Sequence, residues 1–153
     1  MIFVTTGTFG FARLIETVDG MAAAGLLGDD AIAQIGHSPY VPRHMEYFRT
    51  SVDVGRYMDR ARYVISHGGT GSMIELIGMG KKVIGVPNRG LAENHQQVFL
   101  EKLHRDGCIL YAPEPDERLL LRQIQLLDTF QPAPFSFYPP SFIERLRRDV
   151  IDP

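Results

Sequence analysis

The sequence predicts an α/β fold in which a parallel β-sheet is covered by helices on both faces. Short apolar, β-branched runs alternate with segments of helical periodicity, and glycine-rich turns follow several of these runs. Such alternation implies right-handed crossovers, so the carboxyl ends of the strands share one edge, where open α/β sheets bind ligands. A length of 153 residues with 44% hydrophobic and 22% charged residues suits one globular domain.

The first half of the chain is expected to supply three strands and two helices. The strands cover residues 2–5, 31–35 and 47–51, and the helices cover residues 11–24 and 53–61. Apolar residues recur at helical spacing in both helices, Gly25 ends the first, and Asp53 is a suitable cap for the second. Gly7 and Thr8 follow the first strand, where they either line the ligand edge or form a plain tight turn.

The second half continues the same rhythm. Its expected strands cover residues 63–66, 83–86 and 108–111, and its expected helices cover residues 72–79, 94–105 and 116–127. After this domain of residues 1–130, residues 131–153 form a tail that is rich in proline and aromatic residues and ends in a possible helix at 141–150. The tail either docks on a partner chain or packs on its own domain.

Composition excludes several classes of function. A net charge of −2 provides no basic excess with which to displace counterions from a nucleic acid. The single cysteine, Cys108, has no internal disulfide partner, and no segment has the pattern of a signal peptide or a membrane span, so we expect a cytoplasmic chain. The five histidines lack metal-ligand spacing and no acidic Asp-x-Asp motif occurs, so neither a metal nor a cofactor is expected.

The most informative stretch is the glycine-rich turn after the strand at residues 63–66. Its letters are His67-Gly68-Gly69-Thr70-Gly71-Ser72, and the next helix is expected to begin near Ser72 and to stop at Gly80. Free amides at the start of a helix, together with glycines that expose the backbone, form an anion site. The first ligand class implied is therefore phosphate.

Three known site motifs do not match these letters. A Walker loop is excluded because Gly80-Lys81 is followed by Lys82 and lies at the wrong end of the helix. The dinucleotide fingerprint would need a third glycine where Ile74 stands. The Gly-x-Ser-x-Gly elbow of the α/β-hydrolases is also absent.

A different family carries this combination of motifs. His-Gly-Gly-x-Gly-Ser is followed by Glu75, by Gly-Lys-x-Val-Ile-x-Val-Pro over residues 80–87, and by Asn-His-Gln over residues 94–96. The chain thus resembles the C-terminal domain of glycosyltransferase family 28, the Rossmann-like donor half of two-domain (GT-B) enzymes, from about residue 2 to 110. Within that family it is most similar to short subunits of split, two-chain UDP-sugar transferases, of the exopolysaccharide glucuronosyltransferase or UDP-GlcNAc transferase subunit type.

The resemblance implies a role for each part of the motif. The turn would lie at the diphosphate of a UDP-sugar, Glu75 would receive ribose hydroxyls, and Gln96 with His95 or Gln97 would face the sugar, to which Gln offers both a donor and an acceptor. The candidate substrate-binding residues are Gly7, Thr8, His67, Gly68, Gly69, Thr70, Gly71, Ser72, Glu75, Asn94, His95, Gln96 and Gln97. Glu93 stands where the family more often has Asp.

Each residue also has a purely structural interpretation. Ser72 and Glu75 have the spacing of a capping box, in which the glutamate returns to the helix start and contacts no ligand. Taken alone, His67 would be an ordinary loop histidine, and the glycines would serve only the close packing of helix on strand. Arg89 either contacts the sugar or phosphate of the donor or is an exposed loop residue.

By the same resemblance, the catalytic base and the acceptor site lie on a membrane-associated partner subunit. The reaction implied is transfer, with inversion, of a sugar from a UDP-sugar to a lipid-linked saccharide at the inner face of the membrane, with exopolysaccharide or capsule assembly as the setting. One rival is a non-catalytic stabilising or regulatory subunit. Another is a UDP-sugar 2-epimerase, for which 153 residues are too few to hold both domains.

Overall fold

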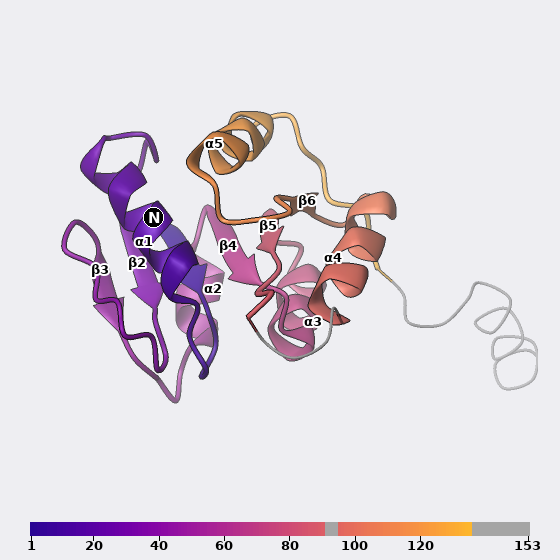
Figure 1. Cartoon of the computed structure of the whole chain (residues 1–153). Helices are drawn as coiled ribbons and strands as arrows, with labels where there is room; N and C mark the ends of the chain where they lie inside the picture. Colours follow the sequence, from indigo (N-terminus) through magenta and orange to yellow (C-terminus); the bar gives the residue numbers. More distant parts are fainter. Residues whose placement is uncertain (91–94, 136–153) are drawn as a thin grey trace, which may run out of the picture.

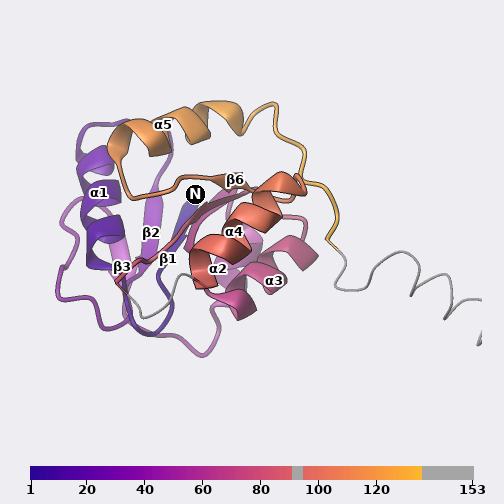
Figure 2. The same cartoon turned by 45° about the vertical axis from the view of Figure 1, so that its right-hand side comes forward.

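The computed structural model describes residues 1–90 and 95–135 and shows one sheet between two layers of helices. The strands are β1 (Ile2–Thr5), β2 (Ala31–Gln34), β3 (Glu46–Phe48), β4 (Tyr63–His67), β5 (Val83–Val86) and β6 (Leu110–Tyr111). The helices are α1 (Ala12–Ala23), α2 (Gly55–Arg60), α3 (Thr70–Gly78), α4 (His95–Arg105) and α5 (Glu117–Leu126). Figures 1 and 2 show α1 and α5 on one side of the sheet and α2, α3 and α4 on the other.

All of the strand pairs are parallel, in the order β3-β2-β1-β4-β5-β6. The order reverses direction between β1 and β4, which is the switch point where parallel sheets of this kind bind ligands outside the carboxyl ends of the strands. This arrangement confirms the expected fold class.

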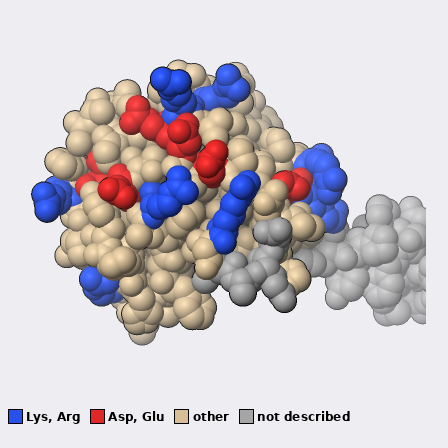
Figure 3. Space-filling view, in the orientation of Figure 1, with Lys and Arg blue, Asp and Glu red and all other residues tan. Residues whose placement is uncertain are grey.

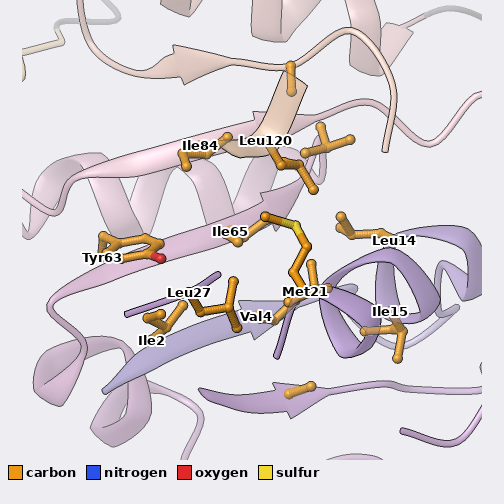
Figure 4. Packing of buried hydrophobic residues seen from close by; sticks show 14 of the residues in the cluster. Ile2, Val4, Leu14, Ile15, Met21, Leu27, Tyr63, Ile65, Ile84 and Leu120 are labelled. Carbon is orange, nitrogen blue, oxygen red and sulfur yellow. The ribbon is translucent and has the colours of Figure 1, made fainter. Parts of the chain in front are cut away.

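The core has two parts because successive side chains of a strand point to opposite faces of the sheet. Ile2 and Val4 of β1 pack under α1 and α5, whereas Phe3 packs under α2, α3 and α4, and all three side chains are fully buried. Figure 4 shows the first cluster, in which Leu14 and Met21 of α1 lie over the sheet. Burial on both faces explains why the strands are apolar throughout.

β2 and β4 differ from their expected bounds by one residue at their ends, and β3 and β6 differ by more, in part for identifiable reasons. Asp19 of α1 is buried and accepts hydrogen bonds from the amides of Arg43 and His44 at 2.8 to 3.1 Å, so the chain enters β3 sooner than residue 47. β6 begins at Leu110 rather than at residue 108, because the amide of Cys108 donates to the Leu103 carbonyl at the end of α4.

The start of the tail contacts its own domain. The amide of Ala133 donates to the Gly107 carbonyl at 2.9 Å, and Phe135 packs at the edge of the core cluster under α4. The expected helix at residues 141–150 lies outside the described residues, and its docking on a partner stays a prediction.

Charge is mixed over the face seen in Figure 3, where aspartate and glutamate lie among lysine and arginine. None of the helices within residues 1–90 and 95–135 is long and apolar enough to cross a membrane.

Candidate functional site

The turn between β4 and α3 leaves the start of α3 open. The helix begins at Thr70 with Gly69 as its N-cap, a residue that has no side chain with which to cap that end. The first intrahelical bond runs from the Met73 amide to the Gly69 carbonyl at 3.0 Å, so the amides of residues 70–72 have no acceptor within the helix. Thr70 and Gly71 are exposed, and these amides and the positive end of the helix dipole therefore face outward.

This helix start corrects two expectations. α3 begins at Thr70 rather than near Ser72, because Gly69 and not the serine takes the N-cap position. Ser72 therefore lies inside the first turn, and the capping-box interpretation of Ser72 and Glu75 is wrong. Glu75 is exposed, and its Oε1 would lie 3.7 Å from a methyl group placed at Gly55, the first residue of α2. Its carboxylate thus lies beside the start of α2, where it is open to a ligand.

The ring of His67 lies between two glycine turns. A methyl group placed at Gly7 would lie 2.9 Å from Cε1 and Nε2 of this ring, and one placed at Gly69 would lie 2.6 Å from Nε2. Gly7 also has a positive φ of 62°. The turn after β1 and the turn after β4 are therefore in contact through one imidazole, which explains why both positions need glycine.

His67 is held mainly in its neutral form. Burial lowers the pKa of the imidazole, and the nearby Thr5 backbone acts in the opposite direction. Its Nδ1 is buried and forms no hydrogen bond of ordinary geometry with any residue in the described part of the chain. A neutral ring contributes one hydrogen-bond donor and one acceptor instead of a full positive charge.

Gln96 joins the turn after β4 to the loop after β5. Its Oε1 accepts from the amide of Gly68 at 3.2 Å and from the amide of Asn88 at 3.0 Å, and a methyl group at Gly68 would lie only 2.7 Å from its Cβ. The carbonyl of this side chain is therefore occupied. Contrary to expectation, only the NH2 group of Gln96 remains to meet a sugar, as a donor.

The other candidate residues lie around this centre or elsewhere. The Thr8 carbonyl accepts from the His37 amide at 2.9 Å, which ties the exposed turn after β1 to the loop after β2. Gln97 donates through Nε2 to Oε1 of Glu101 at 2.8 Å, so its amide is held along α4. His95 is exposed at the start of α4. Asn94 and Glu93 lie outside the described residues.

Arg89 is exposed in the loop after β5. Burial raises the pKa of the Tyr111 phenol in β6, and the nearby charge of Arg89 acts in the opposite direction. The arginine therefore lies beside Tyr111 of β6. The side chain of Asn88 connects two loops of the site, and no local pattern marks an asparagine after a strand as such a long-range contact.

Two hollows of the described surface lie away from the candidate site. One, of about 830 Å³, runs along residues such as Gly28, Asp29 and Glu46 near the amino ends of β2 and β3, and another, of about 610 Å³, lies over residues 39–44. Neither includes a candidate site residue. Among residues 1–90 and 95–135, no group of three or more histidine, cysteine, aspartate or glutamate side chains is placed to hold a metal.

These features describe an α/β domain whose candidate anion site lies at the switch point of its sheet. Residues 1–137 match the model of the glycosyltransferase family 28 C-terminal domain, and the chain belongs to this family. The family resemblance stated from the sequence is confirmed.

Curated relatives carry the name UDP-N-acetylglucosamine transferase subunit ALG13. The human protein is 36% identical over 121 residues, which cover 72% of this chain but only 11% of that protein. The Yarrowia lipolytica protein is 30% identical over 140 residues, which cover 82% of this chain and 71% of that protein. The chain thus spans about a tenth of the human and mouse relatives and most of the yeast one.

Solved structures share the fold. The NMR solution structure of ALG13 matches with a TM-score of 0.60 at 21% identity, covering 99% of this chain and 96% of that chain. The crystal structure of Acinetobacter baumannii MurG matches with a TM-score of 0.58 at 16% identity, covering 86% of this chain and 45% of that chain. These likenesses confirm that the fold is that of one half of a GT-B glycosyltransferase.

Proposed function

We propose that this chain is the donor-binding subunit of an inverting glycosyltransferase that takes a sugar from a UDP-sugar. The observation that carries the proposal is the uncapped start of α3, which lies at the switch point with His67 beside it and with Glu75 on the same helix. Membership of the family and the names of the ALG13 relatives support this assignment.

The geometry suits departure of a nucleoside diphosphate. The amides of residues 70–72 are fixed before any ligand arrives, so they would stabilise the charge that develops on the leaving diphosphate without reorganisation. Glu75 would accept two ribose hydroxyls, and the NH2 group of Gln96 would donate to an oxygen of the sugar.

The base that accepts the proton of the acceptor hydroxyl is proposed to lie on a partner subunit. His67 and Glu75 are assigned to the donor in this scheme, so the chain's own candidate residues leave the role of base to another subunit. The partner is proposed to be membrane-associated and to recruit this chain from the cytoplasm to the inner face of the membrane.

N-acetylglucosamine is the sugar favoured by the names of the relatives, and a lipid-linked saccharide is the proposed acceptor. Exopolysaccharide or capsule assembly is the proposed setting. The names of the relatives do not support this last part, which rests on the resemblance of the sequence alone.

Calorimetric titration of the chain with UDP tests the proposal. We expect saturable binding, and at least a tenfold weaker affinity in Glu75→Ala and in His67→Ala, because a hydrogen bond to a charged group contributes about 1.5–3 kcal/mol. Glu16→Ala serves as the matched control, because Glu16 is an exposed glutamate of α1 on the other face of the sheet.

Comparison of UDP-N-acetylglucosamine with UDP-galactose and UDP-glucuronic acid would then assign the sugar. Absence of UDP binding by the folded chain, or equal binding by the Glu75 variant and the Glu16 control, would exclude a donor site formed by this chain alone.

A further inference from the structure

Asn88 lies immediately beyond β5 and connects three of the loops at the carboxyl edge of the sheet. Its Nδ2 donates to the carbonyl of Gly10, in the loop after β1, at 3.3 Å, although 78 positions separate the two residues. Its Oδ1 accepts from the amide of Gly90, in the loop after β5, at 3.2 Å. Its backbone amide donates to Oε1 of Gln96, which also receives the amide of Gly68 in the turn after β4.

The loop after β1, to which Asn88 bonds, also packs closely against the loop after β2. Gly10 has a φ of 82°, and a methyl group placed there would lie 2.5 Å from the Ser38 nitrogen in the loop after β2. A shift of Gly10 therefore moves the whole turn, including Gly7, whose backbone contacts the ring of His67. Asn88 is thus connected to both glycine turns around the imidazole, to the turn after β1 through its side chain and to the turn after β4 through its backbone amide and Gln96.

The hydrogen bonds of the Asn88 side chain support a specific connection between the loops. This side chain is half-buried, and both of its polar atoms bond to backbone groups. Both the amide nitrogen and the amide oxygen of Asn88 are needed. An aspartate in its place would repel the Gly10 carbonyl, and an alanine would form neither hydrogen bond.

We propose that Asn88 is a positioning residue for the donor site, which fixes the loops after β1, β4 and β5 relative to one another so that the amides at the start of α3 are preformed. Asn88 acts through Gly10, Gln96 and Gly68 and touches no substrate itself. This inference rests on the proposed function for its consequence in UDP binding, but the connection between the loops stands apart from any ligand.

Amide hydrogen exchange tests the connection without a ligand. In Asn88→Ala we expect faster exchange at the Gly90 amide, which loses its acceptor, and also at the Gly68 amide, which loses only the support of the loop that carries residue 88. Unchanged protection at Gly68 would show that the loops are not connected, and would overturn the proposal.

UDP titration tests the consequence. Loss of one or two hydrogen bonds predicts a UDP affinity that is about threefold to tenfold weaker in Asn88→Ala, since each bond contributes about 0.5–1.5 kcal/mol. Asn88→Asp should be weaker still at pH 7 and should recover relative to wild type near pH 4, where the acid regains a proton and donates to the Gly10 carbonyl. A merely structural role would lower the melting temperature and leave the UDP affinity of the folded protein unchanged.

Gln125→Glu is the matched control, because Gln125 is an exposed amide on α5, on the far face, and undergoes the same change of charge. We expect it to bind UDP as wild type does at both pH values. If wild type itself does not bind UDP, the donor assignment fails, while the exchange rates at Gly68 and Gly90 still decide whether Asn88 connects the loops.

Discussion

The N-termini of α3 and α5 both follow strands at the carboxyl edge of the sheet, yet they are completed in opposite ways. α5 has Asp116 as its N-cap, whose carboxylate accepts from the Leu119 amide at 3.0 Å, and Glu117 adds a second acid in the first turn. α3 has Gly69 as its N-cap, no side-chain hydrogen bond and no acid in the first turn. Backbone at both caps is extended, so the difference lies in the side chains.

The two helix starts differ in where their hydrogen-bond acceptors come from. Amides at a helix start need acceptors, and for α5 the chain supplies one itself, the carboxylate of Asp116. At α3 the same groups are exposed to solvent, with a glycine that leaves room for a larger anion. The closed end is therefore structural and the open end is the candidate ligand site.

The largest expected effect comes from making α3 resemble α5. Gly71→Asp places a carboxylate in the first turn of α3, where an added side chain meets no heavy atom within 4 Å. We expect UDP affinity to fall about 100-fold or more, since two like charges about 4 Å apart near a protein surface repel by about 4 kcal/mol. The carboxylate interacts favourably with the positive end of the helix dipole, so the melting temperature should not fall.

Gly71→Asn is the control for this change, because it has the same size without the charge. Equal UDP affinity in the Asp and Asn variants would mean that no anion binds at the start of α3, and the comparison between the two helices would lose its functional meaning.

The sequence predicted the fold well because its strands are buried runs and its turns are marked by glycine. The start of α3 was misplaced by two residues, because Ser72 has the stronger local preference for a cap. Gly69 takes that position for a tertiary reason, since the ring of His67 occupies the space where a side chain would lie.

The hydrogen bonds within the site could not be predicted from the sequence. Gln96 and Gly68 are 28 positions apart, and no local pattern indicates that the amide oxygen of Gln96 is shared between two backbone groups. The same holds for Asn88 and Gly10. Motif letters identify which residues gather at a site, whereas the direction in which each amide points depends on the packing of loops from distant parts of the chain.

Removal of the cap of α5 is the converse test, with a smaller effect. Asp116→Ala leaves the Leu119 amide without its acceptor, and we expect a loss of about 1 kcal/mol in the free energy of unfolding, measured by urea denaturation. UDP affinity should remain that of wild type, because this helix start is completed by the chain itself. A variant that loses UDP binding but keeps its stability would place the ligand at α5 instead.

The smallest effect provides the sharpest separation of stability from function. Gly71 and Gly78 stand near the two ends of α3, and a methyl group at either position meets no heavy atom within 4 Å. Alanine at each should therefore raise the free energy of unfolding by about 0.5–1 kcal/mol, since glycine within a helix costs that much relative to alanine. Only Gly71→Ala should weaken UDP binding, by about threefold, because its methyl group stands among the open amides and obstructs at least part of one hydrogen bond.

Denaturation and calorimetry on the two variants would show opposite changes in stability and affinity for Gly71→Ala and a change in stability alone for Gly78→Ala. If both variants bound UDP as wild type does, the glycine at position 71 would be explained by neither helix stability nor ligand approach.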